Sequence, residues 1–164
     1  MKKLYITRHA KSDWSDPGQD DFDRVLNKRG KNDLPKMGKY LREAGVCPDL
    51  MLSSPAARAA KTAKKLAVEI GYPAVNIVFN QSLYLAPKTT LLSVIQQIPA
   101  ETKTLMIVGH NPGLTELANL LSDADIENIP TCGIATIHFN IDDWASVHRN
   151  NAQFIDFTYP KKLL

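Results

Sequence analysis

Two histidines and two arginines in this 164-residue sequence lie at positions from which they could bind an anion. Arg8 and His9 directly follow a short apolar run, Arg58 lies one turn into a helical segment, and His110 follows another apolar run. A guanidinium group matches phosphate oxygens with two parallel hydrogen bonds, and a neutral imidazole can attack phosphorus. These residue types therefore indicate a pocket that binds a phosphoryl group and transfers it.

The elements that must position these residues alternate between short β-rich runs and helical patterns. Strands are expected at 3–7, 49–53, 75–79, 104–108, 134–139 and 154–158, and helices at 34–44, 54–70, 90–98 and 112–121. Asn32 or Asp33 would cap the first helix, with Pro35 in its first turn, and Ser54-Pro55 would open the second. This order predicts a single α/β domain over residues 1–164, a three-layer α/β/α sandwich with a mostly parallel central sheet. The short link 140–152 favours an antiparallel hairpin that supplies the edge strand.

Ligands of open α/β sheets bind at the carboxyl ends of the strands. Three such ends, at residues 7–10, 53–58 and 109–113, bring the two arginines and two histidines to one rim. None of these segments contains an acidic residue, so the cluster would repel itself unless an anion lies in it.

The composition excludes several other classes of protein. Lys plus Arg total 20 against 17 Asp plus Glu, and a net charge of +3 is too small to indicate nucleic acid as a partner. Cys47 and Cys132 match no metal spacing, which favours two reduced, buried thiols. The apolar run 4–6 is too short for a signal peptide, and no stretch approaches a membrane span, so we expect a cytoplasmic protein that does not bind membranes.

Three segments taken together resemble the histidine phosphatase superfamily, the phosphoglycerate-mutase-like group. They are Arg8-His9-Ala10 after the first strand, Ser53–Ala59 at a helix start, and Gly109-His110-Asn111 after a later strand. The small size, together with the stretches 8–12 and 23–30, looks most like the SixA branch of phosphohistidine phosphatases. The resemblance extends from residue 4 to about residue 139.

The resemblance implies a role for each matching residue. His9 would be the nucleophile that becomes phosphorylated, Arg8 and Arg58 would clamp the phosphoryl oxygens, and His110 would donate to the phosphoryl group. Ser12 is a further candidate for binding the phosphate. No metal or other cofactor is implied, because guanidinium groups take the place of cations. The implied substrate is a phosphorylated protein bearing phosphohistidine, or a small phosphate ester, and the oligomeric state is not indicated.

Two departures from the family pattern bear on the chemistry. Ala10 replaces the usual Gly, and its methyl group could either crowd the pocket or have no effect. Many members carry a Glu as proton donor, but the comparable stretch 81–87 has no acidic residue, which favours the good leaving group of a phosphohistidine. Asp13, Asp16 and Asp23 remain as candidate acids from the loop.

Two alternatives to a phosphohistidine phosphatase stay open. One is a phosphatase or mutase acting on small phosphomonoesters, although the chain has few extra residues between motifs to build a substrate cap. The other is a non-catalytic phosphate-binding regulatory module. Of the remaining residues near the motifs, Arg24 and Arg29 are expected to pair with the nearby carboxylates of Asp20, Asp21 and Asp23. Trp14 is a lid, a partner contact or an ordinary packing residue.

Overall fold

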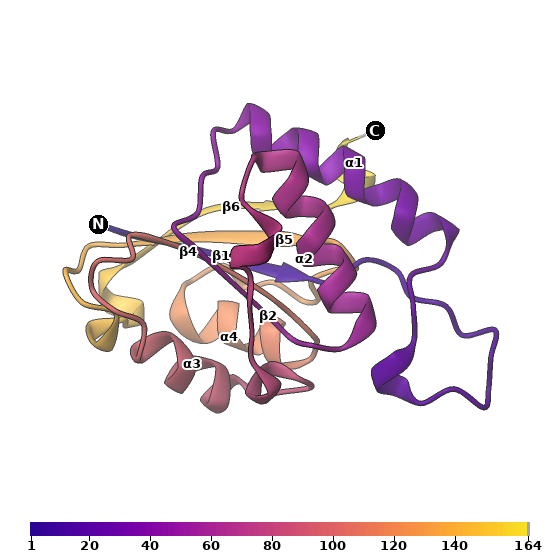
Figure 1. Ribbon diagram of the computed structural model, residues 1–164. Helices are drawn as coiled ribbons and strands as arrows, with labels where there is room; N and C mark the ends of the chain where they lie inside the picture. Colours follow the sequence, from indigo (N-terminus) through magenta and orange to yellow (C-terminus); the bar gives the residue numbers. More distant parts are fainter. Residues whose placement is uncertain (164) are drawn as a thin grey trace.

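A six-stranded sheet runs through the middle of the computed structural model, which describes residues 1–163 (Figure 1). Its order is β3-β2-β4-β1-β5-β6. The strands are β1 (Lys2–Arg8), β2 (Leu50–Ser53), β3 (Val78–Phe79), β4 (Thr104–Gly109), β5 (Ile134–Phe139) and β6 (Ala152–Thr158). The first four strands pair in parallel, whereas β5 is antiparallel to both β1 and β6. The expected sheet and its antiparallel edge are therefore confirmed.

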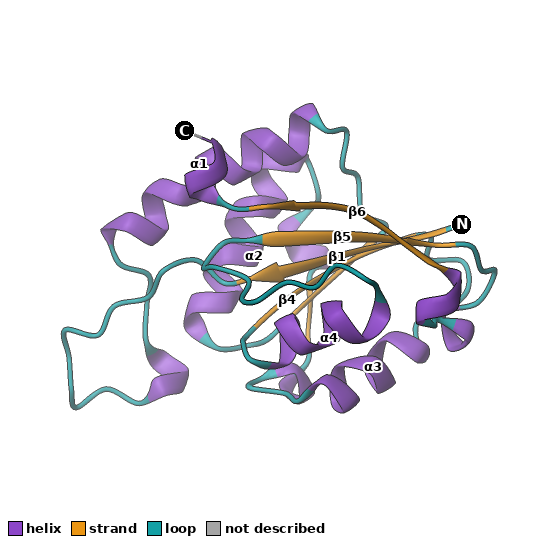
Figure 2. Cartoon of the chain, turned by 180° about the vertical axis from the view of Figure 1, so that it is seen from behind, coloured by secondary structure: helices purple, strands orange, loops and turns teal. Residues whose placement is uncertain are grey.

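Helices cover both faces of this sheet (Figure 2). α1 (Lys28–Glu43) and α2 (Ala57–Ile70) lie on one face, and α3 (Lys88–Gln96) and α4 (Gly113–Leu121) lie on the other. Each pair buries its apolar side chains in a separate hydrophobic cluster against the sheet. Burial of these two clusters supplies the main stabilising term of the three-layer sandwich. Short 3₁₀ helices complete the described elements: η1 (Asp21–Asp23), η2 (Ala74–Asn76), η3 (Gln81–Leu83), η4 (Trp144–Ser146), η5 (Arg149–Asn151) and η6 (Pro160–Leu163).

The start of α1 differs from the expected one. The helix begins at residue 28 instead of 34, because the Asn27 side chain accepts a hydrogen bond from the backbone N–H of Gly30 (2.8 Å) and caps it. The predicted cap at Asn32 or Asp33 is wrong, and Pro35 lies inside the helix, not in its first turn. The extra turns matter for function, since they carry the N-terminus of α1 toward the residues that follow β1.

Two further boundaries were predicted too early in the chain. α2 begins at residue 57 with Ala56 as its N-cap, because the Ser54 side chain instead accepts a hydrogen bond from the backbone of Ala56 (3.2 Å) and forms a separate turn. β3 contains only Val78 and Phe79, because residues 74–76 form a 3₁₀ helix. Neither difference changes the order of the elements.

Candidate active site

A pocket of about 220 Å³ opens where β1, β2 and β4 end. All five side chains predicted for the site line it: Arg8, His9, Ser12, Arg58 and His110. The other lining residues are Lys11, Trp14, Asp21, Arg24, Leu85, Asn111 and Thr131. The fold thus brings the three motif segments to one rim, as their positions after parallel strands required.

Backbone hydrogen bonds hold His9 in place just beyond β1. Its N–H donates to the carbonyl of Gly109 (3.1 Å) at the end of β4, and its carbonyl accepts from the N–H of Cys132 (2.9 Å). The next residue, Ala10, donates its N–H to the Thr62 hydroxyl in α2 (2.9 Å). Neighbouring elements therefore fix the backbone that carries His9 from three sides.

The ring of His9 is neutral and has a defined tautomer. Its Nδ1 lies 2.7 Å from the carbonyl oxygen of Ala10, and a carbonyl can only accept, so Nδ1 carries the proton. Burial lowers the pKa of His9 to about 3, and the nearby His110, Arg58 and Arg8 lower it as well. At neutral pH the lone pair of Nε2 is therefore free to act as a nucleophile.

The two arginines place positive charge beside this ring. Arg58 is only 2% exposed, and its Nη1 and Nη2 donate to the backbone carbonyl (2.7 Å) and the carboxylate (2.9 Å) of Asp21. Arg8 donates from Nη1 to the carbonyl of Ile129 (2.9 Å). The Nε atoms of both arginines are buried and have no hydrogen-bond partner within residues 1–163. Burial and the charge of Arg58 also lower the pKa of Arg8, so an anion in the pocket would relieve the mutual repulsion.

His110 offers a second donor next to His9, with the ring centroids 5.2 Å apart. Its Nε2 lies 2.7 Å from the hydroxyl of Ser54, which already accepts from the N–H of Ala56. Because Ser54 is fully buried, its hydroxyl hydrogen needs an acceptor, and Nε2 of His110 is within reach. The hydroxyl therefore donates a hydrogen bond to Nε2, and neutral His110 carries its own proton on Nδ1. That Nδ1 is buried without a partner in the described part of the chain. Burial, followed by the charge of Arg58, lowers the pKa of His110 to about 4.

Asp21 is the carboxylate of this pocket, and the sequence analysis did not select it. Partial burial would raise its pKa, but hydrogen bonds from Tyr84 and Arg58 outweigh burial and lower the pKa to about 2. The loop acids predicted instead, Asp13, Asp16 and Asp23, are not among the residues that line the pocket. The sequence does place Asp21 in the first turn of η1, where an acidic residue is favourable. No short-range spacing in the sequence relates Asp21 to Arg58.

Tyr84 comes from the stretch 81–87, where no acid was found. Its hydroxyl donates to Oδ2 of Asp21 (2.5 Å), and its ring meets His110 edge-on, with centroids 5.5 Å apart. Partial burial and the hydrogen bond to Asp21 raise the pKa of Tyr84, so the phenol keeps its proton. The phenol therefore orients the carboxylate of Asp21.

Ser12 is held by a third arginine. Arg24 is buried, donates from Nη1 to the Ser12 hydroxyl, and lies with its guanidinium carbon 3.5 Å from the ring centroid of Trp14. Arg24 also pairs with Asp21 at 3.1 Å, as expected. The expected partner of Arg29 was wrong, because its Nε lies 3.7 Å from the carboxylate of Asp33 in the next turn of α1.

The replacement of the usual glycine by Ala10 does not crowd the pocket. Ala10 is fully buried and belongs to the hydrophobic cluster beneath α1 and α2. The pocket lining does not include it, so its methyl group packs into the core.

The two cysteines do not form a disulfide bond. Both cysteines are free, as expected, but Cys47 is exposed and only Cys132 is buried. Residues 1–163 contain no group of three or more His, Cys, Asp or Glu side chains that could hold a metal ion. Over the same residues, no helix combines the length and apolar character that a membrane span requires.

Similar proteins give an independent view of the chain. Residues 4–81 match the model of the histidine phosphatase superfamily (branch 1). An uncharacterized chloroplastic protein of Arabidopsis thaliana is 33% identical over 151 residues, which cover 87% of this chain and 69% of the relative. An uncharacterized protein of Mycobacterium tuberculosis is 32% identical over 164 residues, which cover 94% of this chain and 99% of the relative.

The fold leads to the same group of proteins. A solved structure from Agrobacterium tumefaciens that bears the name SixA is similar with a TM-score of 0.81 and 30% identity, covering 97% of this chain and 98% of that one. Sequence and fold therefore agree over nearly the whole length, and this chain belongs to the histidine phosphatase superfamily, in its SixA-type branch.

Proposed function

We propose that this protein is a phosphatase that removes the phosphoryl group from phosphohistidine residues of proteins, through a phosphorylated His9. The observation that carries the proposal is the free Nε2 of neutral His9 in a pocket lined by Arg8, Arg58 and His110. A nucleophile surrounded by donors for three oxygens suits phosphoryl transfer, which needs alignment and charge stabilisation above all.

In the first step, Nε2 of His9 attacks phosphorus as the N–P bond of the substrate breaks. The substrate ring leaves as neutral imidazole when its other nitrogen is already protonated. The guanidinium groups of Arg8 and Arg58 and the Nδ1–H of His110 stabilise the charge on the transferring oxygens. The product is phospho-His9, whose ring keeps its proton on Nδ1 against the carbonyl of Ala10.

In the second step, water attacks the phosphorus of phospho-His9. The N–P bond breaks, its electron pair returns to Nε2, and inorganic phosphate leaves with the proton that water gives up. The Ala10 carbonyl keeps Nδ1 protonated, so His9 departs as neutral imidazole instead of an anion. Splitting hydrolysis into these two transfers is the advantage of a covalent intermediate.

The acid groups of the pocket favour a leaving group that needs no proton from the enzyme. Asp21 has a pKa of about 2 and is ionised at neutral pH. The phenol of Tyr84 has a raised pKa and keeps its proton, with which it donates a hydrogen bond to Asp21. Neither suits general acid catalysis near pH 7. An alkoxide leaving group requires such an acid, whereas a protonated phosphohistidine ring does not, so phosphohistidine is the better substrate.

The test is phosphate release from a phosphohistidine-bearing protein in the presence of EDTA. We expect turnover by wild type and loss of at least three orders of magnitude in His9→Ala. His148→Ala serves as the matched control and should keep full activity. His148 caps η5, which leads into the start of β6, and this start is aligned through Phe139 with the start of β1, at the edge of the sheet opposite to His9. With a labelled phosphoryl donor, wild type should form an acid-labile, alkali-stable phosphoenzyme that His9→Ala lacks.

The same assays separate the alternatives. Faster turnover of a small phosphomonoester than of the phosphohistidine protein would replace our substrate assignment. Phosphate affinity without turnover or labelling would make the protein a binding module. Full activity of His9→Ala would exclude the intermediate that the whole proposal requires.

A further inference from the structure

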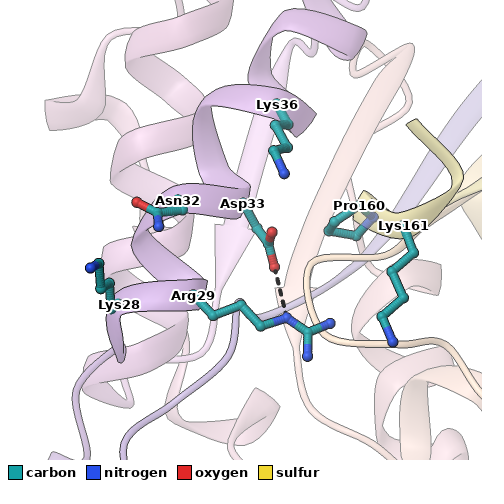
Figure 3. A pocket seen from close by; sticks show the side chains of 7 residues that line it. All are labelled: Lys28, Arg29, Asn32, Asp33, Lys36, Pro160 and Lys161. Carbon is teal, nitrogen blue, oxygen red and sulfur yellow. Dashed lines mark ion pairs between the residues drawn. The ribbon is translucent and has the colours of Figure 1, made fainter. Parts of the chain in front are cut away.

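A second hollow of about 470 Å³ lies between α1 and η6, outside the pocket described above. We refer to it as the α1–η6 groove. It is lined by Lys28, Arg29, Asn32, Asp33, Lys36, Pro160 and Lys161, so four cationic side chains face a single carboxylate. Figure 3 shows Arg29 and Lys161 extending into the same space from the two elements, with Lys36 on the other side of Asp33.

The groove is at the same edge of the sheet as His9. β6 ends at Thr158, which pairs with Ile134, and Ile134 in turn pairs with Thr7 at the end of β1. η6 follows β6 directly, so its first residues lie on the rim where the phosphoryl pocket opens. In Figure 1 the yellow C-terminal segment lies beside α1.

The other wall of the groove is also tied to the active site. Asn27, the cap of α1, donates its N–H to the carbonyl of Lys11 (3.0 Å), and Lys11 lines the phosphoryl pocket. Lys28 and Arg29 follow in the first turn of α1. A molecule held by Arg29 therefore lies within about one helical turn of the chain segment that forms the pocket.

Most of the positive charge in the groove has no ion-pair partner within residues 1–163. Asp33 is buried, and Nε of Arg29 lies 3.7 Å from its carboxylate, so these two charges offset one another. Lys28, Lys36 and Lys161 form no ion pair within 4.0 Å among residues 1–163. Three unpaired ammonium groups around one hollow create a local positive potential that attracts carboxylates and raises the rate of encounter with an acidic surface.

We propose that the α1–η6 groove is a docking site for an acidic segment of the phosphorylated protein whose phosphohistidine enters the active site. The inference rests on the proposed function, since it supplies the partner for the same reaction. Arg29 and Lys36 are seven residues apart on one helix, which is about 10 Å. An extended segment of about three or four residues spans that length, so a short run of Asp or Glu fits the groove. A nucleic acid engages many phosphates along a basic surface, and four cations in one hollow form too small a footprint for it.

Two synthetic peptides test this docking site. Each carries one histidine, phosphorylated chemically, and a Gly/Ser linker that leads to four Glu in one peptide and four Gln in the other. At low salt we expect wild type to hydrolyse the Glu peptide with at least tenfold higher kcat/KM than the Gln peptide, mainly through KM. The ratio should fall toward one in about 0.5 M NaCl, where exposed charges are screened.

Variants then locate the effect in the groove. In Lys28→Gln/Lys36→Gln/Lys161→Gln we expect the Glu peptide to lose its tenfold advantage, while the Gln peptide is hydrolysed as by wild type. The matched control, Lys3→Gln/Lys39→Gln/Lys103→Gln, removes the same charge from exposed lysines, two of which lie at the opposite edge of the sheet. That variant should keep the advantage.

The outcomes separate this inference from the proposed function. If wild type hydrolyses neither peptide, the proposed function fails. If it hydrolyses both equally well, or if the control variant loses the advantage as fully as the groove variant, the enzyme stands and the docking site is refuted. A single-stranded oligonucleotide that inhibits Glu-peptide hydrolysis at lower concentration than a non-phosphorylated Glu peptide would assign the groove to nucleic acid.

Discussion

Oδ2 of Asp21 lies 2.9 Å from Nη2 of Arg58, so the buried guanidinium of the pocket is paired with a carboxylate. Arg58 is 2% exposed at its side chain, whereas Asp21 is 40% exposed. The carboxylate can therefore swing toward solvent more easily than the guanidinium can. An incoming phosphoryl group meets Asp21 as a competitor for the same donors.

Asp21→Asn should bind inorganic phosphate more tightly. The change removes a negative charge next to the anion site but keeps a side chain of the same size, and we expect the inhibition constant for phosphate to fall about tenfold, or about 1.4 kcal/mol. Tyr84→Phe is the control, because it deletes the hydrogen bond to Asp21 and leaves the charge in place. Phosphate inhibition of phosphohistidine hydrolysis measures both. Weaker phosphate binding by Asp21→Asn would mean that the carboxylate serves mainly to orient Arg58.

The buried histidines should make the fold less stable in acid. The pKa of His9 is about 3 and that of His110 about 4 in the folded protein, against an unfolded value of 6.5. Between about pH 4 and 6.5 the unfolded chain therefore binds more protons than the folded one, and stability falls as the pH falls. At pH 5.0 each histidine accounts for a loss of about 2 kcal/mol relative to pH 7.5.

Urea unfolding at pH 7.5 and 5.0 measures this loss. His9→Asn and His110→Asn should each lose about 2 kcal/mol less than wild type between the two pH values. His148, which is exposed, provides the control, and His148→Asn should show the full acid sensitivity of wild type. Equal acid sensitivity in all four proteins would show that His9 and His110 are protonated in the folded state at pH 5.0.

Much of the fold was predictable because its strands are buried on both faces and are apolar without alternation. β4 and β5 were found within a residue of their observed ends for this reason. The start of α1 was missed because Pro35 looks like a first-turn residue, and the capping by Asn27 depends on a turn that the apolar pattern does not include. Two local signals disagreed on where the helix begins, and the observed start follows the capping by Asn27 and not the position of Pro35.

Some residues of the site were predictable from the sequence and others were not. Arg8, His9, Arg58 and His110 were found because each follows a strand or opens a helix, which are positions that sequence patterns can locate. Asp21 reaches Arg58 across 37 residues and Tyr84 across 63. No spacing rule links such positions, and only the packing of η1 and the 81–87 stretch over the rim brings them together.

Trp14→Ala should weaken substrate binding with little effect on stability. The Trp14 ring covers the guanidinium of Arg24, which in turn donates to Ser12 in the pocket. Since Trp14 is 71% exposed, its loss should change the free energy of unfolding by no more than about 0.5 kcal/mol. We expect KM for a phosphohistidine substrate to rise about three- to tenfold. Trp14→Phe keeps an aromatic face and should recover most of the affinity, and failure of both variants to change KM would mean that Arg24 needs no support from the ring.

Gly30→Ala should damage the fold and the site together. A Cβ at this position of α1 would lie 2.2 Å from the backbone carbonyl oxygen of Lys11, and a backbone atom cannot move aside as a side chain can. The gain in helix propensity, about 1 kcal/mol, is smaller than the cost of forcing the two segments apart, so we expect a net destabilisation of about 1–3 kcal/mol. Because Lys11 and Ser12 line the phosphoryl pocket, kcat/KM should also fall.

Gly18→Ala is the matched control for that change. A Cβ there would lie 3.5 Å from the nearest atom, on the side chain of Asp16, which is an ordinary contact. Urea unfolding and hydrolysis of a phosphohistidine substrate should leave Gly18→Ala within about 0.5 kcal/mol of wild type and fully active. If Gly30→Ala matched the control in both assays, the close packing of α1 on the segment after β1 would not be what holds the pocket in shape.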